Sequence, residues 1–164
     1  MKIKSILALL SVLVFTFACG KATEEDEFNA AGEPSSGHLE GKVAAEDWTY
    51  AAGRAKPLAM NPSRLSIDLF GSVPNGDICS FNPGINDTRI QFTVQKTTGT
   101  FPLDYSAGQT VNFYLDGQQD PLVSSRGSIW LTDINSRSVT GKLKTIYNEN
   151  NVVNGQFLVV HCEN

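Results

Sequence analysis

The chain has 164 residues, of which 41% are hydrophobic and 18% charged, and its formal net charge is −4 at pH 7. This length fits a single domain of ordinary size, and the composition is globular rather than disordered or membrane-spanning. The acidic balance argues against nucleic-acid binding, because phosphate recognition needs a clustered basic face.

Residues 1–18 have the pattern of a secretory signal peptide. Lys2 and Lys4 form a positively charged start, and residues 6–18 are almost wholly apolar. An apolar segment of roughly 13 residues is too short to cross a bilayer, which needs about 20, but suits a signal peptide. Cleavage after Ala18 removes two lysines and no acid, so the formal charge of the mature chain becomes −6.

Cys19 ends the apolar segment, between Ala18 and Gly20. A small residue before a lone cysteine at this place resembles the lipobox of bacterial lipoproteins. That resemblance implies that the Cys19 thiol receives a diacylglycerol, with fatty acids such as palmitate, and anchors the chain outside the cytoplasm. Gly20 follows the cysteine, at the place where an Asp would mark retention in the inner membrane. The resemblance therefore implies that the chain is retained in the outer membrane, on either of its two sides. Thr16 departs from the family's preferred Leu, so cleavage without lipidation stays an alternative.

Residues 19–37 are predicted to be the lipidated cysteine and a flexible acidic tether. Small, acidic, Pro and Ser residues cannot bury enough apolar surface to offset the entropy of ordering. Residues 24–27, Glu-Glu-Asp-Glu, resemble the acidic run that directs some lipoproteins to the cell surface. The alternative is a solvated linker. The folded domain is then expected over residues 38–164.

From Leu39 onward the sequence alternates between apolar and polar residues with a period of two, which predicts β-strands separated by turns. The alternating segments are residues 65–69, 90–94, 111–115, 129–131, 139–146 and 152–160. Turns are expected at Asp116-Gly117 and at residues 148–151. We predict an all-β antiparallel sandwich of about eight to ten strands. The alternative is a closed, lipocalin-like barrel with an apolar interior large enough for a ligand.

The segment around Trp48 permits two interpretations. Trp48, Ala51, Ala52 and Ala55 fall at helical spacing. A hairpin through residues 45–47 is favoured, because Gly53 would interrupt a helix and the flanking apolar residues fit strands.

Two cysteines remain if Cys19 carries lipid. In an oxidising compartment, Cys79 and Cys162 are expected to form a disulfide that joins a mid-chain loop to the last strand. The alternative is two free thiols.

Several short phrases between residues 39 and 162 resemble small secreted bacterial lipoproteins of unknown function. They are Gly41-x-Val43 with Trp48-Thr49, Gly99-Thr100-Phe101-Pro102-Leu103, Gly127-x-Ile129-x-Leu131-Thr132, Val139-Thr140-Gly141-x-Leu143 and Val153-Asn154-Gly155-x-Phe157. The resemblance implies a β-sandwich presented outside the cytoplasm, and it implies no activity.

No catalytic or metal-binding signature is present in the sequence. Nucleophile-elbow, His-Glu-x-x-His and glycine-rich phosphate motifs are missing, and only His38 and His161 could serve a triad or a zinc ion. The acids available on strands or turns are Asp68, Asp104, Asp116, Asp120 and Asp133. Most stand where Asp is an ordinary turn residue, and a calcium loop at Asp116 and Asp120 would lack the usual spacing. We therefore expect no enzyme, no metal and no cofactor.

Three aromatic residues are the candidate ligand contacts. Tyr114 and Trp130 have the strand parity opposite to their apolar neighbours, and Phe70 shares the parity of Ser66 and Asp68. Outward aromatic rings could stack on sugars or hold a protein, unless a loop covers them. The expected function is an envelope-anchored binding or structural module that contacts the membrane through lipid and an envelope protein or glycan. The alternatives are a barrel carrying a small hydrophobic ligand and, third, a carboxylate-based hydrolase.

Overall fold

The computed structural model describes residues 33–163, and all regular secondary structure within them is β-strand. The predicted signal peptide, Cys19 and most of the predicted tether lie outside the described residues. The strands are β1 (Glu40–Val43), β2 (Glu46–Thr49), β3 (Ala52–Leu58), β4 (Asn61–Phe70), β5 (Arg89–Gln95), β6 (Gly99–Pro102), β7 (Val111–Tyr114), β8 (Leu122–Ser124), β9 (Gly127–Ile134), β10 (Ser138–Asn148) and β11 (Asn151–His161). In residues 33–163 no helix is long and apolar enough to cross a membrane.

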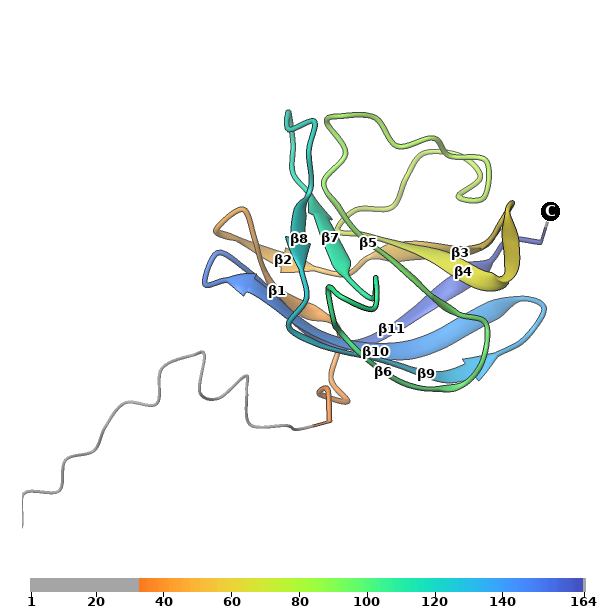
Figure 1. Ribbon diagram of the computed structural model, residues 1–164. Coiled ribbons are helices and arrows are strands. Elements are labelled where there is room, and N and C mark those ends of the chain that lie inside the picture. The colour runs from red at the N-terminus through yellow and green to blue at the C-terminus, as the bar shows by residue number, and fades with distance from the viewer. Residues whose placement is uncertain (1–32, 164) are drawn as a thin grey trace, which may run out of the picture.

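The strands form one curled sheet, a half-barrel (Figure 1). Its order is β6-β9-β10-β11-β3-β4-β5-β7-β8, and β1 pairs with both β11 and β2. All pairs are antiparallel except β11 and β3, where Val160 stands opposite Arg54. The all-β prediction is confirmed. The pairing differs from the expected antiparallel sandwich, since a parallel pair links the two halves of one mixed sheet, and from a closed barrel, since the end strands β6 and β8 do not pair.

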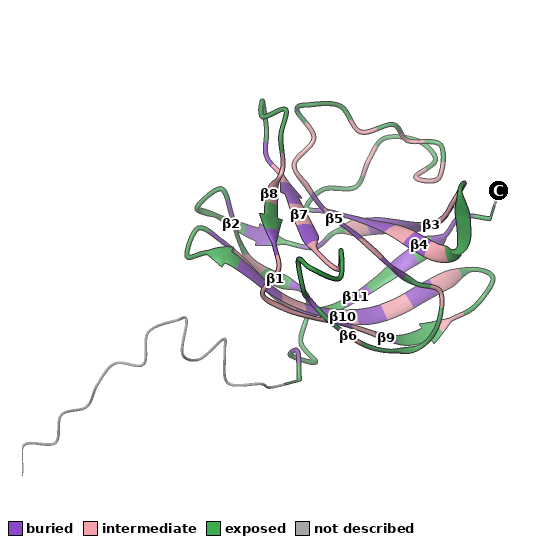
Figure 2. Cartoon of the chain, viewed as in Figure 1, coloured by how far each residue is buried: buried purple, intermediate pink, exposed green. Residues whose placement is uncertain are grey.

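The predicted alternating segments all become strands, because each presents one apolar face to a common core. Leu65, Ile67 and Leu69 of β4 are fully buried, and so are Ile90 and Val94 of β5. The rings of Phe92 and Phe157 meet edge to face at 5.9 Å between centroids. Figure 2 shows this alternation along the strands. Burial of the apolar faces fixes the register, because a slip by one residue would turn every apolar side chain outward.

A hairpin forms around Trp48, and the helical interpretation of this segment is wrong. The turn lies at Ala44 and Ala45, slightly earlier than predicted, with φ angles of 56° and 68°. Two such residues in the left-handed region match the right-handed twist of a two-residue hairpin. The Ala44 amide donates to Asn151 Oδ1 at 2.9 Å, and the Ala45 amide donates to the Asn150 carbonyl at 2.9 Å. The β10–β11 turn therefore holds the β1–β2 turn in place.

The last residues of the predicted tether pack against the sheet, which corrects the expectation of flexibility up to residue 37. Glu33 pairs with Lys142 at 2.5 Å, and the Ser35 amide donates to Asn154 Oδ1 at 2.8 Å. The chain then crosses Gly155, where a Cβ atom would stand 2.5 Å from the Leu39 Cα atom. Residues 33–38 therefore belong to the outer surface of β10 and β11.

The chain enters the domain on the opposite side from its longest loop. Figure 1 shows the start of the described chain, in orange, below β10 and β11, whereas residues 71–88 and the β7–β8 turn project from the upper half. We call residues 71–88 the cap loop.

Candidate functional site

The outer face of β3, β4 and β5 carries a buried ion cluster. Arg54 Nε donates to Asp68 Oδ2 at 2.9 Å, and Arg89 Nε stands 3.9 Å from Asp68 Oδ1. Arg54 is 6% exposed and Asp68 is 4% exposed. The Arg89 guanidinium also lies 3.8 Å above the centre of the Tyr114 ring. A buried carboxylate between two guanidinium groups is tolerated only while all partners stay in place.

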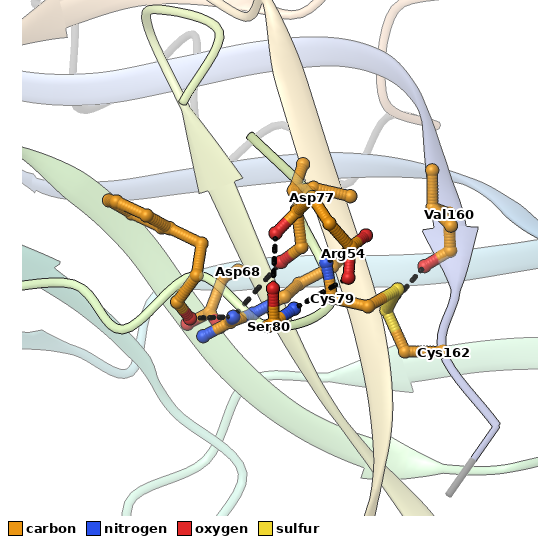
Figure 3. Close-up of a disulfide and its surroundings, with 9 residues drawn as sticks. Arg54, Asp68, Asp77, Cys79, Ser80, Val160 and Cys162 are labelled. Atoms are coloured by element: carbon orange, nitrogen blue, oxygen red, sulfur yellow. Dashed lines mark hydrogen bonds and ion pairs between the residues drawn. A yellow bond between two sulfur atoms is a disulfide. The ribbon is translucent and has the colours of Figure 1, made fainter. Parts of the chain in front are cut away.

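The cap loop covers this cluster and is fastened at two points. Arg54 Nη1 donates to the Ile78 carbonyl at 3.1 Å and to the Phe81 carbonyl. Between those residues, Cys79 is joined to Cys162 by a disulfide with a Cα–Cα distance of 5.6 Å (Figure 3). The structure thus pairs the two cysteines as the sequence predicted, and the bond ties the cap loop to the end of β11.

The turn at the tip of the cap loop is stabilised by Asp77. Its carboxylate accepts hydrogen bonds from the amides of Cys79 at 3.1 Å and Ser80 at 3.2 Å. These bonds, led by the one from Cys79, hold the pKa of Asp77 below its ordinary value. The carboxylate therefore acts locally, as a cap for the turn that carries Cys79.

A hollow of about 360 Å³ lies between the cap loop, the end of β4 and the β7–β8 turn, and we call it the cap hollow. Its lining combines aromatic rings, hydroxyls, an amide and two carboxylates, with no lysine or arginine. The lining residues are Trp48, Phe70, Gly71, Ser72, Pro74, Phe81, Asn86, Asp87, Thr88 and Asp116.

Two polar side chains of the cap hollow differ from the turn residues elsewhere. The Asp104 carboxylate accepts two hydrogen bonds from Ser106, which lower its pKa, and the Asn135 side chain accepts from the amides of Arg137 and Ser138. In contrast, the side chains of Asn86 and Asp116 make no hydrogen bond or ion pair within residues 33–163. Both side chains are exposed, so their polar atoms are available to a ligand in the hollow.

Trp48 forms one wall of the cap hollow. It is not among the site residues predicted from the sequence. It is 7% exposed, and its Nε1 atom has no hydrogen-bond partner within the described part of the chain. Gly71 lies directly against it, since a Cβ atom there would stand 2.5 Å from Nε1. No local pattern could reveal this, because Trp48 and Gly71 meet only through the tertiary fold.

The three predicted aromatic contacts have different environments. Phe70 is 3% exposed and lies edge-on to Phe81 at 5.6 Å, so the expectation that it faces solvent is wrong: the cap loop covers it. It lines the cap hollow nonetheless. Tyr114 is half-buried, with its hydroxyl donating to Gln91 at 3.2 Å. Trp130 is half-buried on β9, opposite Lys142 of β10, on the other half of the sheet. The structure does not bring the three together.

The two histidines are separated and each donates to a backbone carbonyl. His38 Nε2 donates to Tyr50 at 2.6 Å, and His161 Nδ1 donates to Asn135 at 2.5 Å. His38 pairs with Gln156, five residues before His161 on β11, which places them about 16 Å apart at roughly 3.3 Å per residue. Within residues 33–163 no three His, Cys, Asp or Glu side chains gather as metal ligands.

Comparison with protein-family models, with curated proteins and with solved structures finds no match to this chain. The assignment of a function therefore depends on the geometry described above.

Proposed function

We propose that this protein is an envelope-anchored lipoprotein that acts as a binding module, with the cap hollow as its binding site. The observation that supports this proposal is that the start of the described chain and the cap loop lie on opposite sides of the domain (Figure 1). A chain tethered through Cys19 would then present the cap hollow away from the membrane. The proposal includes no catalytic step.

The length of the tether fits such a display. Thirteen residues lie between Cys19 and Glu33, so the two can stand about 50 Å apart when the segment is fully extended and about 20 Å apart as a flexible coil. Residues 33–38 are fixed to β10 and β11, so the tether leaves the domain from one defined face. The lipid would therefore retain the domain and keep this face, on average, the nearer one to the membrane.

The geometry favours a surface site over an internal one. The concave face of the half-barrel is filled by fully buried side chains, among them Phe92, Phe113 and Phe157. A carrier of a small hydrophobic ligand would need an open apolar interior at this place. The cap hollow, by contrast, opens between two surface loops.

Membrane fractionation and protease treatment of intact cells test this function. We expect the chain to fractionate with membranes, Cys19→Ser to release it into the soluble fraction, and Thr16→Leu, which restores the preferred lipobox residue, to keep it anchored. Retention of Cys19→Ser on membranes would contradict the lipid anchor. Cleavage of the domain by protease on intact cells indicates the outer side of the envelope, and protection until the outer membrane is broken indicates the inner side.

A further inference from the structure

The composition of the cap hollow indicates the chemical class of its ligand. We propose that it binds an uncharged carbohydrate, with the carboxylates of Asp87 and Asp116 accepting hydrogen bonds from sugar hydroxyls. This inference rests on the proposed function, which assigns the hollow as the binding site, and it adds the class of ligand.

The charges around the hollow disfavour an anionic ligand. Two carboxylates and no cationic side chain line it. Two arginines on the neighbouring strands are already engaged: Arg54 pairs with Asp68 and donates to a carbonyl of the cap loop, and Arg89 lies between Asp68 and the Tyr114 ring. A ligand rich in donors is favoured instead, since hydrogen bonds to carboxylates are stronger than those between neutral groups.

The two carboxylates are held on facing loops before any ligand arrives. Asp87 belongs to the cap loop, and its Oδ2 atom accepts from the Gly84 amide at 2.6 Å. Asp116 belongs to the β7–β8 turn, where the Gly117 amide donates to the Ile85 carbonyl of the cap loop at 3.2 Å. That backbone bond and the disulfide fix the spacing between the loops, so little ordering remains to oppose binding.

Ring faces and an unpartnered donor complete the site. Phe81 is half-buried in the lining, packed edge-on against Phe70. A sugar places its apolar C–H face against such rings while its hydroxyls reach polar groups. The Nε1–H group of Trp48 is buried and has no acceptor within residues 33–163. Buried donors without acceptors are rare and call for an explanation, and a sugar oxygen in the cap hollow would supply the acceptor if Gly71, which covers Nε1, moves aside as the ligand binds.

Tryptophan fluorescence of the full chain in detergent tests the inference. The chain has two tryptophans, so Trp130→Phe leaves Trp48 as the only reporter. The probes are neutral tetrasaccharides (chitotetraose, cellotetraose and maltotetraose), tetragalacturonate as an anionic sugar, and spermidine as a non-sugar cation. We expect at least one neutral tetrasaccharide to change the Trp48 emission saturably, and tetragalacturonate to bind at least tenfold more weakly.

Asp116→Asn in the same background tests the placement of the ligand. We expect it to weaken the sugar at least tenfold, whereas Asp120→Asn, on the same loop but outside the lining, should change affinity less than twofold. Unchanged melting temperatures for both variants exclude unfolding as the cause.

The other outcomes separate the ligand class from the site. Binding of spermidine alone, weakened by Asp116→Asn, would overturn the carbohydrate class and leave the site standing. Sugar binding that is unaffected by Asp116→Asn would overturn the assignment of the hollow itself. Absence of any response at millimolar probe would overturn the carbohydrate inference, whereas the anchored location is judged separately by the fractionation of Cys19→Ser.

Discussion

The residues on the two outer faces of the curled sheet follow the same alternating sequence pattern, but their environments differ. On β3–β5 the outward residues include Arg54, Asp68 and Phe70, which are all buried beneath the cap loop. On β11 the outward residues include Leu158 and Val160, which are 59% and 44% exposed. A residue that the alternating pattern places on the outer face of the sheet is therefore not always exposed to solvent. A loop that folds back over the sheet can bury its charged residues as ion pairs.

The two faces are also stabilised by different kinds of interaction. The cap side depends on a few strong, long-range ties, namely the ion cluster and the disulfide. The opposite face, formed by β10 and β11 and covered by residues 33–38, is called the tether side. It depends on weaker contacts made by residues 33–38, including the Glu33–Lys142 pair. Single substitutions should therefore be most damaging on the cap side.

The largest effect is expected from Asp68→Ala. Removal of the carboxylate leaves two buried guanidinium groups without their counter-charge, which typically costs about 3–5 kcal/mol of the free energy of unfolding. Asp133→Ala on exposed β9 is the control and should cost within about 0.5 kcal/mol. Urea denaturation measures both, and a loss below about 1 kcal/mol for Asp68→Ala would show that the cap side is not held by its ion cluster.

Removal of the disulfide should have the next largest effect. The bond links residues 83 positions apart, and loss of such a cross-link typically costs about 2–4 kcal/mol. Cys79→Ala/Cys162→Ala should lower the urea midpoint, and the cap loop should become sensitive to limited proteolysis while β10 and β11 stay resistant. Equal sensitivity of both faces would remove the distinction between them.

Gly155→Ala tests the tether side. The new Cβ atom would meet the backbone at Leu39, and the φ angle of 149° is itself unfavourable for alanine. We expect a loss of about 1–3 kcal/mol and increased amide exchange in residues 33–38. Gly84→Ala, where the nearest atom is an ordinary 3.6 Å away, is the control. A stable Gly155→Ala variant with protected amides would show that the chain does not depend on this crossing.

The smallest effect is a loss of stability in strong alkali. Burial raises the pKa of Tyr50 to about 12 from its model-compound value of 10.0, and its hydroxyl donates to the Leu158 carbonyl. Because the folded state holds this proton more tightly, its contribution is complete below pH 10 and is lost as the pH rises from 10 to 12. Tyr50→Phe should flatten the stability profile across this window. An unchanged slope would assign the alkaline loss to other groups.

The sequence could predict local structure, namely strands and turns, but not contacts between segments that are far apart in the chain. The strands of residues 65–69 and 139–160 follow from period two, and the turn at residues 148–151 follows from its polar composition. The covering of Phe70 does not, because residues 71–88 carry no periodic pattern that fixes where they lie. The parallel pairing of Val160 with Arg54 joins segments about a hundred positions apart, which no local preference can encode.

The candidate site was even less accessible to such reasoning. Asp116 was recognisable only as a turn residue, and the evidence for another role is that its carboxylate makes no turn contact. Trp48 was assigned to a strand, correctly, but its unpartnered Nε1 atom becomes apparent only beside Gly71. The disulfide was predictable because few cysteines were available to pair.

The position of β11 has a consequence for the order of folding. It is the last of the described strands in the chain, yet it lies at the centre of the sheet and pairs with β10, β1 and β3. β3, β4 and β5 can form only an open fragment until residues 151–162 pair with β3. The same short segment therefore joins the two halves of the sheet, through the pairing of β11 with β3, and supplies Cys162 for the disulfide with Cys79. The two halves are therefore expected to fold as one cooperative unit.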